Sequence, residues 1–293
     1  MVAVLRGLRL RDLFAVLVVL VFMFPLFWWV LASFKPYTAI FSRIPNYFDF
    51  AATLDNYRVA LLGASRINLE QGVGGQTGGA SSYYSIPSIL DSIIIAIGST
   101  VLAVLFATLA AYALSRFPIR AKKHVVFFIL AQRMMPPIAV AIPLFFIFRD
   151  IGLRDTHIGI IIAHTLINLP LATLLLKSFF DDVPRDLDES AMIDGASRFT
   201  VFWRIVLPLV RGGIAATAVL CFIFSWTEFL ISLQLTTSIR TIPVKITTFV
   251  TSTGTEWGLI TALGSAALVP SFIFILLVQR HLVRGLTLGS LKD

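Results

Sequence analysis

The sequence has few charged residues and almost no cysteine. Asp, Glu, Lys and Arg make up 14% of its 293 residues, whereas soluble domains contain about 25%. So little charge cannot cover a water-facing surface, which excludes a soluble globular protein. The single cysteine, Cys221, excludes an intrachain disulfide and a thiolate metal cluster. It lies within an apolar run, where a small packed thiol is expected.

Apolar residues dominate the chain instead. They account for 57% of the sequence, and the mean hydropathy is +0.88. A net charge of +8 would indicate a nucleic-acid partner in a soluble protein. Here the cations flank apolar runs, so they are better explained as orienting the chain in a bilayer. We therefore expect an all-α integral membrane protein in contact with membrane lipid, and no nucleic-acid partner.

Six apolar runs are long enough to cross a membrane, which takes about 20 residues in a helix. The predicted spans are 13–34, 86–114, 124–148, 157–176, 209–233 and 259–283. The third run is interrupted by the polar and proline-containing segment 132–137. Residues 1–293 are thus predicted to form a single transmembrane domain, with a long outer loop at 35–85 and a long inner loop at 178–208.

The distribution of Lys and Arg predicts the orientation. With the N-terminus inside, the inner segments hold 15 of these 24 residues and the outer segments hold 8, while Arg133 falls within a span. Because short cytoplasmic loops carry the excess of positive charge, both termini are expected in the cytoplasm. The first apolar run exceeds the core of about 7–15 residues found in signal peptides, which favours a retained helix.

The outer loop contains a Gly-rich stretch, residues 72–82. A phosphate-binding loop needs Lys after its last glycine, but Ala80 follows Gly79. We therefore expect a surface loop there, with contact to an external partner as one option. No phosphate-binding lysine loop is found in the chain, so any ATP must be hydrolysed by another subunit.

The inner loop, residues 178–208, has the pattern of two short helices that meet at a glycine, and we call it the elbow. Gly195 can supply the left-handed residue that ends a helix. Ser197 can cap a second helix over 198–207, before Pro208 leads into the fifth span. Such an elbow suits insertion into a cleft of another protein. A solvated amphipathic connector is an equally good interpretation of the pattern alone.

The elbow resembles the EAA loop of ABC importer permeases. That loop reads E-A-A, three residues, G, nine residues, then I-x-L-P. Here Glu189-Ser190-Ala191, Gly195 and Ile205-Val206-Leu207-Pro208 fit the spacing at every position, with Ser190 as the one departure. The chain looks most similar to maltose-type carbohydrate permeases, and the other segments that carry this similarity are 53–57, 135–137, 225–229 and 285–289.

The resemblance implies a coupling role for the elbow and a set of partners. In that family the elbow docks in a groove of the ATPase, so the expected coupling residues are Glu189, Ser190, Ala191, Asp194, Gly195 and Ala196. The expected partners are a second homologous permease in a heterodimer, two ABC ATPase subunits that hold ATP and Mg, and a periplasmic or extracellular solute-binding protein. The chain itself is expected to bind no cofactor or metal and to have no catalytic residue. It would lie in a bacterial-type inner (cytoplasmic) membrane and import a sugar or sugar derivative by alternating access.

Polar side chains inside the predicted spans indicate a substrate path, because burying charge in a bilayer is costly. The candidates are Gln132, Arg133, Asn168, Trp226, Thr227 and Glu228. The Trp226 ring could stack on a sugar, and the amides and carboxylate could bond its hydroxyls. Structural interpretations compete with this one: an Arg133–Glu228 ion pair, a packed His164, and an Asn168 that bonds carbonyls freed by Pro170.

An ion-coupled secondary transporter of a small polar solute is the alternative function. Such transporters often contain internal repeats with paired broken helices, but no repeat is evident between 1–150 and 151–293, and the elbow would be unexplained. An intramembrane enzyme is disfavoured because the four His residues are scattered without metal-ligand spacing. The sequence leaves open a mono- or disaccharide, a polyol or an acidic sugar as substrate.

Overall fold

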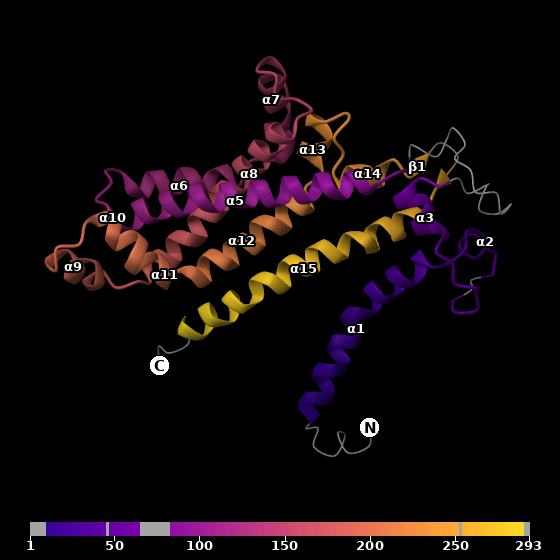
Figure 1. Cartoon of the computed structure of the whole chain (residues 1–293), viewed down its shortest axis with the longest axis horizontal. Coiled ribbons are helices and arrows are strands. Elements are labelled where there is room, and N and C mark those ends of the chain that lie inside the picture. Colours follow the sequence, from indigo (N-terminus) through magenta and orange to yellow (C-terminus); the bar gives the residue numbers. More distant parts are fainter. Residues whose placement is uncertain (1–9, 45–46, 65–82, 252–253, 290–293) are drawn as a thin grey trace. The chain divides into compact units, whose positions relative to one another are not determined.

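A computed structural model describes residues 10–44, 47–64, 83–251 and 254–289, and most of these residues are helical (Figure 1). It divides into two compact units: residues 1–86 with 245–268, and residues 87–244 with 269–293. The Gly-rich segment 72–82 lies outside the described residues, as do the side chains of the tail segment 285–289.

The first unit packs the end of the first helix against two later segments. Its elements are α1 (Leu10–Ser33), α2 (Tyr37–Ile40), α3 (Asp55–Leu62), the second half of α14 (Ile242–Thr247), a two-residue antiparallel pair, β1 (Val250–Thr251) and β2 (Gly254–Thr255), and the first part of α15 (Trp257–Gly289). Asn56 Nδ2 donates to the carbonyls of Ser33 (3.0 Å) and Lys35 (2.7 Å). A Cβ on Gly258 would lie 2.4 Å from Asn56 Oδ1, so only glycine permits this close approach.

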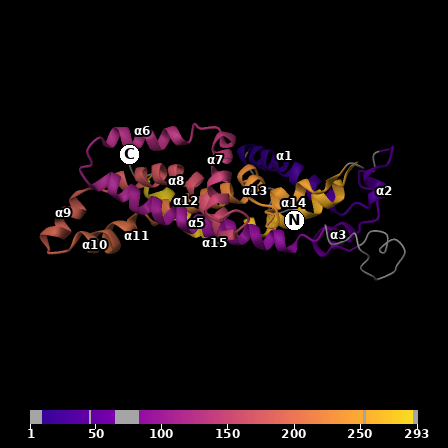
Figure 2. The same ribbon diagram turned by 90° about the horizontal axis from the view of Figure 1, so that it is seen from above.

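The second unit is a helical bundle that ends in the elbow. Its elements are α5 (Ile86–Arg116, whose first residue belongs to the first unit), α6 (Lys122–Gln132), α7 (Pro137–Asp150), α8 (His157–Asp181), α9 (Asp186–Ile193), α10 (Arg198–Val201), the π-helical η3 (Phe202–Val206), α11 (Leu207–Leu209), α12 (Arg211–Trp226) and α13 (Leu230–Leu235). Figure 2 shows α6 running beside α8. Helices α8 and α12 pack closely, since a Cβ on Gly213 would lie 2.3 Å from the Phe179 ring.

The predicted spans correspond to helices, but two of them are bent. Within the part of the chain that the structure describes, four helices are long and apolar enough to cross a membrane: α1, α5, α8 and the part of α15 up to Gln279. The pair α6–α7 is bent by 91°, and the pair 198–209 with 211–226 by 72°, so the total reaches six if each pair counts as one span. The segment 124–148 is therefore not one straight helix, because Pro136 and Pro137 lack amide hydrogens at its centre. The predicted fifth run, 209–233, also breaks after Trp226.

A loop before α8 is fixed by Asp155. Its backbone is left-handed, with φ 57°, and its carboxylate accepts hydrogen bonds from the amides of Thr237, Ser238 and Ile239 at 2.9–3.2 Å. Burial alone would raise the pKa of this carboxyl, but the hydrogen bonds outweigh it and hold the pKa well below the usual 3.8. The charged form of Asp155 therefore stabilises the native connection to the segment after α13.

We expect Asp155→Asn to lower the free energy of unfolding by about 1.5–3 kcal/mol at pH 7, the range for hydrogen bonds to a charged group. A depressed native pKa gives stability that is complete above the unfolded value of 3.8 and is lost as the pH falls toward the native pKa. Thermal unfolding of the unmodified protein and of Asp155→Asn, at pH 7 and at pH 3.5, measures the difference in stability between them. Asn tolerates the left-handed backbone, so an equal difference at both pH values would contradict the charge-based explanation.

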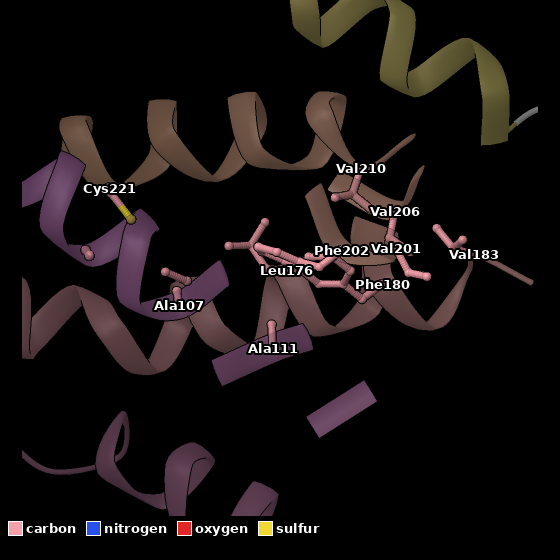
Figure 3. Packing of buried hydrophobic residues seen from close by; sticks show 12 residues of the cluster. Ala107, Ala111, Leu176, Phe180, Val183, Val201, Phe202, Val206, Val210 and Cys221 are labelled. Atoms are coloured by element: carbon pink, nitrogen blue, oxygen red, sulfur yellow. The ribbon is translucent and has the colours of Figure 1, made fainter. Parts of the chain in front are cut away.

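A buried apolar cluster connects the elbow to the bundle. Figure 3 shows Leu176 and Phe180 of α8 against Val201 and Phe202 of the elbow, with Ala111 of α5 alongside. All five side chains are at most 6% exposed. The second arm of the elbow is thus part of the core of the second unit.

Candidate functional site

The first arm of the elbow ends as the sequence predicts. Helix α9 stops at Ile193, and Gly195 takes φ 87°, a left-handed backbone that glycine adopts without strain. The Gly195 amide donates to the Met192 carbonyl (3.1 Å) and the Ala196 amide to the Ala191 carbonyl (2.9 Å). This pair of bonds is a Schellman motif, which satisfies the last carbonyls of the helix.

The second arm begins with the predicted cap. Ser197 Oγ accepts a hydrogen bond from the Thr200 amide at 3.2 Å. The helix then widens into the π-helical η3, where the Leu207 amide donates to the Phe202 carbonyl. Pro208 lies inside α11 and has no amide hydrogen. The predicted helix over 198–207 is therefore present, continues to Leu209, and contains a π-helical segment that the sequence did not indicate.

The elbow presents both polar and apolar side chains to the outside. Of the six predicted coupling residues, four are exposed and two, Ala191 and Ala196, are half-buried against the apolar cluster. Sequence analysis missed two exposed apolar side chains that flank the turn, Ile193 (86% exposed) and Phe199 (71% exposed). Their signal was an apolar residue on each side of Gly195 in an otherwise polar loop. Exposed apolar groups with adjacent acids are typical of a protein-docking surface.

The predicted path residues fall into two groups in the second unit. Gln132 and Arg133 are exposed at the bend between α6 and α7. The Arg133 guanidinium lies over the Phe224 ring of α12, 5.3 Å from its centre. Asn168 lies on α8, Trp226 is the last residue of α12, and Thr227 and Glu228 form the break that follows it. Contact between Arg133 and Phe224 thus brings the bend close to α12.

Glu228 is paired with His164, within a network of serines. His164 Nε2 lies 3.3 Å from Glu228 Oε2, and the His164 side chain is fully buried. Glu228 also accepts from the amides of Ile231 (2.7 Å) and Ser232 (2.9 Å), which starts α13 after the break. Among the described residues Arg133 makes no ion pair with Glu228, so that sequence-based alternative is wrong. The packed interpretation of His164 agrees with its burial.

The network continues to α5 through two serine hydroxyls. Ser225 Oγ lies 2.7 Å from His164 Nδ1, and Ser99 Oγ donates to Ser225 Oγ at 2.8 Å. The network therefore holds α5, α8, α12 and α13 together. Ser99 and Ser225 were missed by sequence analysis, because a serine in an apolar helix gives no signal of its partner.

The remaining path residues are largely covered in this conformation. Trp226 is 9% exposed, and its ring stacks on Phe222 with centres 5.5 Å apart. Asn168 is 2% exposed and donates to the Cys221 carbonyl of α12 at 3.4 Å. Thr227 is exposed, and its hydroxyl donates to the Ile223 carbonyl. Within the described ranges, no group of three or more His, Cys, Asp or Glu side chains is placed to hold a metal ion.

A chain with several apolar helices, a polar network between them and an exposed elbow at one end of the bundle belongs to the class of multi-pass membrane transport proteins. Residues 103–288 match the family of binding-protein-dependent transport system inner membrane components. The chain belongs to this family, and it is a permease subunit of an ABC importer.

Relatives and solved structures agree with this assignment. The sulfoquinovosyl glycerol transport system permease protein SmoH of Agrobacterium fabrum is 31% identical, with 98% of this chain and 94% of SmoH covered. The trehalose/maltose transport system permease protein MalG of Thermococcus litoralis is 34% identical (95% and 94% covered), and the trehalose transport system permease protein SugB of Mycobacterium tuberculosis is 37% identical (70% and 76%). The fold is similar to a bacterial ABC transporter involved in the import of the acidic polysaccharide alginate, with TM-score 0.66, 20% identity, and 92% and 94% covered.

Proposed function

We propose that this permease imports a sugar or sugar derivative by alternating access. It pairs with a second homologous permease, works with two ATPase subunits that bind ATP and Mg, and receives substrate from a solute-binding protein. It lies in the inner membrane with both termini in the cytoplasm. The similarity to SmoH, SugB and MalG supports the substrate class, since the names of all three refer to a sugar or sugar derivative.

The exposed elbow is the observation that carries the coupling part of the proposal. Its turn holds Gly195 outward: apart from Gly195 and its two chain neighbours, no described residue has an atom within 4 Å of where a Cβ would stand. Ile193 and Phe199 offer apolar contact on either side, and Glu189 and Asp194 are exposed beside them. Insertion of this tip into the ATPase would remove the apolar side chains from water and leave the acids to orient the contact.

The substrate path is proposed at the two interrupted helices. The bend, which begins at Arg133 directly after Gln132 at the end of α6, and the break at Thr227–Glu228 are non-helical backbone in the midst of apolar helices. Non-helical backbone at membrane depth is tolerated where it is buried in protein or lines a water-filled cavity. Trp226 and Asn168 are covered here, so in this proposal they reach substrate only when the helices move during alternating access.

The test begins with affinity purification of the chain from its native membranes in mild detergent, followed by mass spectrometry. We expect a second six-span permease and a P-loop ATPase to come with it. The purified complex, reconstituted with its binding protein, should then take up radiolabelled trehalose, maltose or sulfoquinovosyl glycerol only when ATP is present inside the liposomes. A chain that purifies alone and drives uptake on an ion gradient without ATP would be a secondary transporter, and the proposal would fail.

A further inference from the structure

The elbow is joined to the end of α5 by three polar contacts, which we call the α5 junction. Arg116 Nε lies 2.7 Å from Asp188 Oδ2 of α9. A second Arg116 nitrogen donates to the Val183 carbonyl at 3.0 Å. In the opposite direction, Arg185 donates to the Ser115 carbonyl at 2.8 Å. Each side thus supplies an arginine to the other, although the two segments are about 70 residues apart in sequence.

Burial distinguishes the Arg116–Asp188 contact from the ion pairs on the surface. The Arg116 side chain is 5% exposed and that of Asp188 is 11% exposed. The Arg149–Asp150 pair, by comparison, is 53% and 63% exposed. Exposed pairs contribute little, because water screens them, whereas separating a buried pair leaves an uncompensated charge. The α5 junction therefore resists separation more strongly than a surface contact would.

The α5 junction adds a third attachment to an elbow that already has two. The chain leads into the elbow from α8 and out of it into α12, with a 72° bend at Val210 between α11 and α12. Among the described residues, the α5 junction contains the one ion pair that joins the first arm, α9, to a helix not adjacent to it in sequence. A displacement of α9 therefore acts on α5 directly.

Helix α5 can carry such a displacement over a long distance. It contains 31 residues and is about 46 Å long at 1.5 Å per residue. The other long helices, α1, α8 and α15, each contain an internal proline, whereas the proline of α5 lies in its first turn. Internal prolines remove a backbone hydrogen bond and allow kinks. Helix α5 has no proline beyond its first turn.

The far part of α5 contacts the segments that border the proposed substrate path. Ser99 donates to Ser225, which joins the His164–Glu228 network. About two turns before Ser99, Ser92 Oγ accepts from the Ile242 amide at 2.8 Å, and Asp91 pairs with His157 at the start of α8. A movement of α5 along its axis would disturb all of these contacts together.

We propose that Arg116 and Asp188 are positioning residues that transmit elbow movement to α5, and through α5 to the break at Thr227–Glu228. This inference rests on the proposed docking of the elbow to the ATPase. The ion pair makes α9 and the end of α5 move together, so that closure of the ATPase subunits shifts the serine network. Without the pair, the ATPase still binds the elbow and hydrolyses ATP, but less of the movement reaches α5, because the Arg185–Ser115 hydrogen bond and the apolar cluster remain as its weaker connections to the elbow.

The experiment measures sugar transported per ATP hydrolysed in complexes with Asp188→Asn. Complexes are purified through a tag on the ATPase subunit, so only assembled ones enter the assay, and are reconstituted with the binding protein. The probe is whichever of radiolabelled trehalose, maltose and sulfoquinovosyl glycerol the unmodified complex imports. We expect the ratio to fall about fivefold or more, the lower end of typical coupling effects. Asp188→Glu, which keeps the charge, should recover most of the ratio.

Two further variants make the result specific. Asp150→Asn removes the same charge from an exposed pair and should leave the ratio unchanged. Arg185→Gln, at an exposed position, removes only the Ser115 contact and should lower the ratio by a smaller factor; it also serves as the test if Asp188→Asn complexes do not assemble. An unchanged ratio in assembled Asp188→Asn complexes, or in Arg185→Gln complexes in that case, overturns the inference.

The outcome also separates this inference from the proposed docking. If a bulky residue at Gly195 leaves ATPase binding intact, the docking proposal is wrong and the inference fails with it. If that variant loses the ATPase while Asp188→Asn retains both the ATPase and the normal ratio, docking stands and only transmission through α5 is wrong.

Discussion

Gly195→Trp is expected to reach the membrane and fold, yet to bind the ATPase subunits about 30-fold more weakly or worse, with a corresponding loss of ATP-driven uptake. The size follows from the loss of at least about 2 kcal/mol at the centre of a docking surface. A Cβ at Gly195 would have no atom of a described residue within 4 Å, apart from Gly195 and its two chain neighbours. An indole there points into open space in the isolated subunit and meets only a docked partner. Co-purification of the ATPase with the variant measures the effect.

The backbone of Gly195 requires a control, because φ 87° is strained for most side chains. Asn tolerates this conformation and is small, so Gly195→Asn should retain most ATPase binding. The difference between the Trp and Asn variants then reports contact with the partner. Equal loss in both would mean that the backbone conformation is responsible, and normal uptake by Gly195→Trp would refute the docking role.

His164→Leu is the second change with a large expected effect, a loss of about 3–5 kcal/mol in the free energy of unfolding. It removes the partner of Glu228 and the acceptor for Ser225 in a site where His164 is fully buried. Burying a charge or a hydroxyl without a partner is costly. Thermal unfolding of the detergent-purified chain, followed by size-exclusion chromatography, measures the loss.

A control substitution at another histidine, His157, and a second substitution at Glu228 test the cause of the lost stability. His157 pairs with Asp91 at 2.8 Å but is 40% exposed, so His157→Leu should cost no more than about 1 kcal/mol. Adding Glu228→Gln to His164→Leu removes the unpaired charge, while the amide oxygen can still accept from one of the two backbone amides, that of Ile231 or that of Ser232. The double variant should be more stable than His164→Leu alone; equal stability would show that the charge of Glu228 is not the cause.

Local signals explain what the sequence could predict. Gly195 and Ser197 act within a few residues of themselves, so the end of α9 and the cap of α10 follow from residue type and spacing. The apolar runs likewise predicted where the long helices lie, because composition over about 20 residues decides this. The exact extent of the fifth run was not predictable, since an apolar pattern continues across the break at Thr227.

Partnerships between distant residues could not be predicted. Asp188 carries no sequence signal of its partner, because its pairing with Arg116 depends on how α9 folds back against α5. Glu228 was assigned either to substrate or to Arg133, whereas its partner is His164, 64 positions earlier. Such pairs are set by packing, which a single sequence does not reveal.

The turn at Gly195 has a mechanical consequence. The last carbonyls of α9 are satisfied by the amides of Gly195 and Ala196, and α10 is capped separately by Ser197. Rotation about the bonds between Ala196 and Ser197 therefore breaks no backbone hydrogen bond of either arm. The angle between the two arms is therefore set by side-chain packing in the apolar cluster and by the α5 junction, and not by backbone hydrogen bonds.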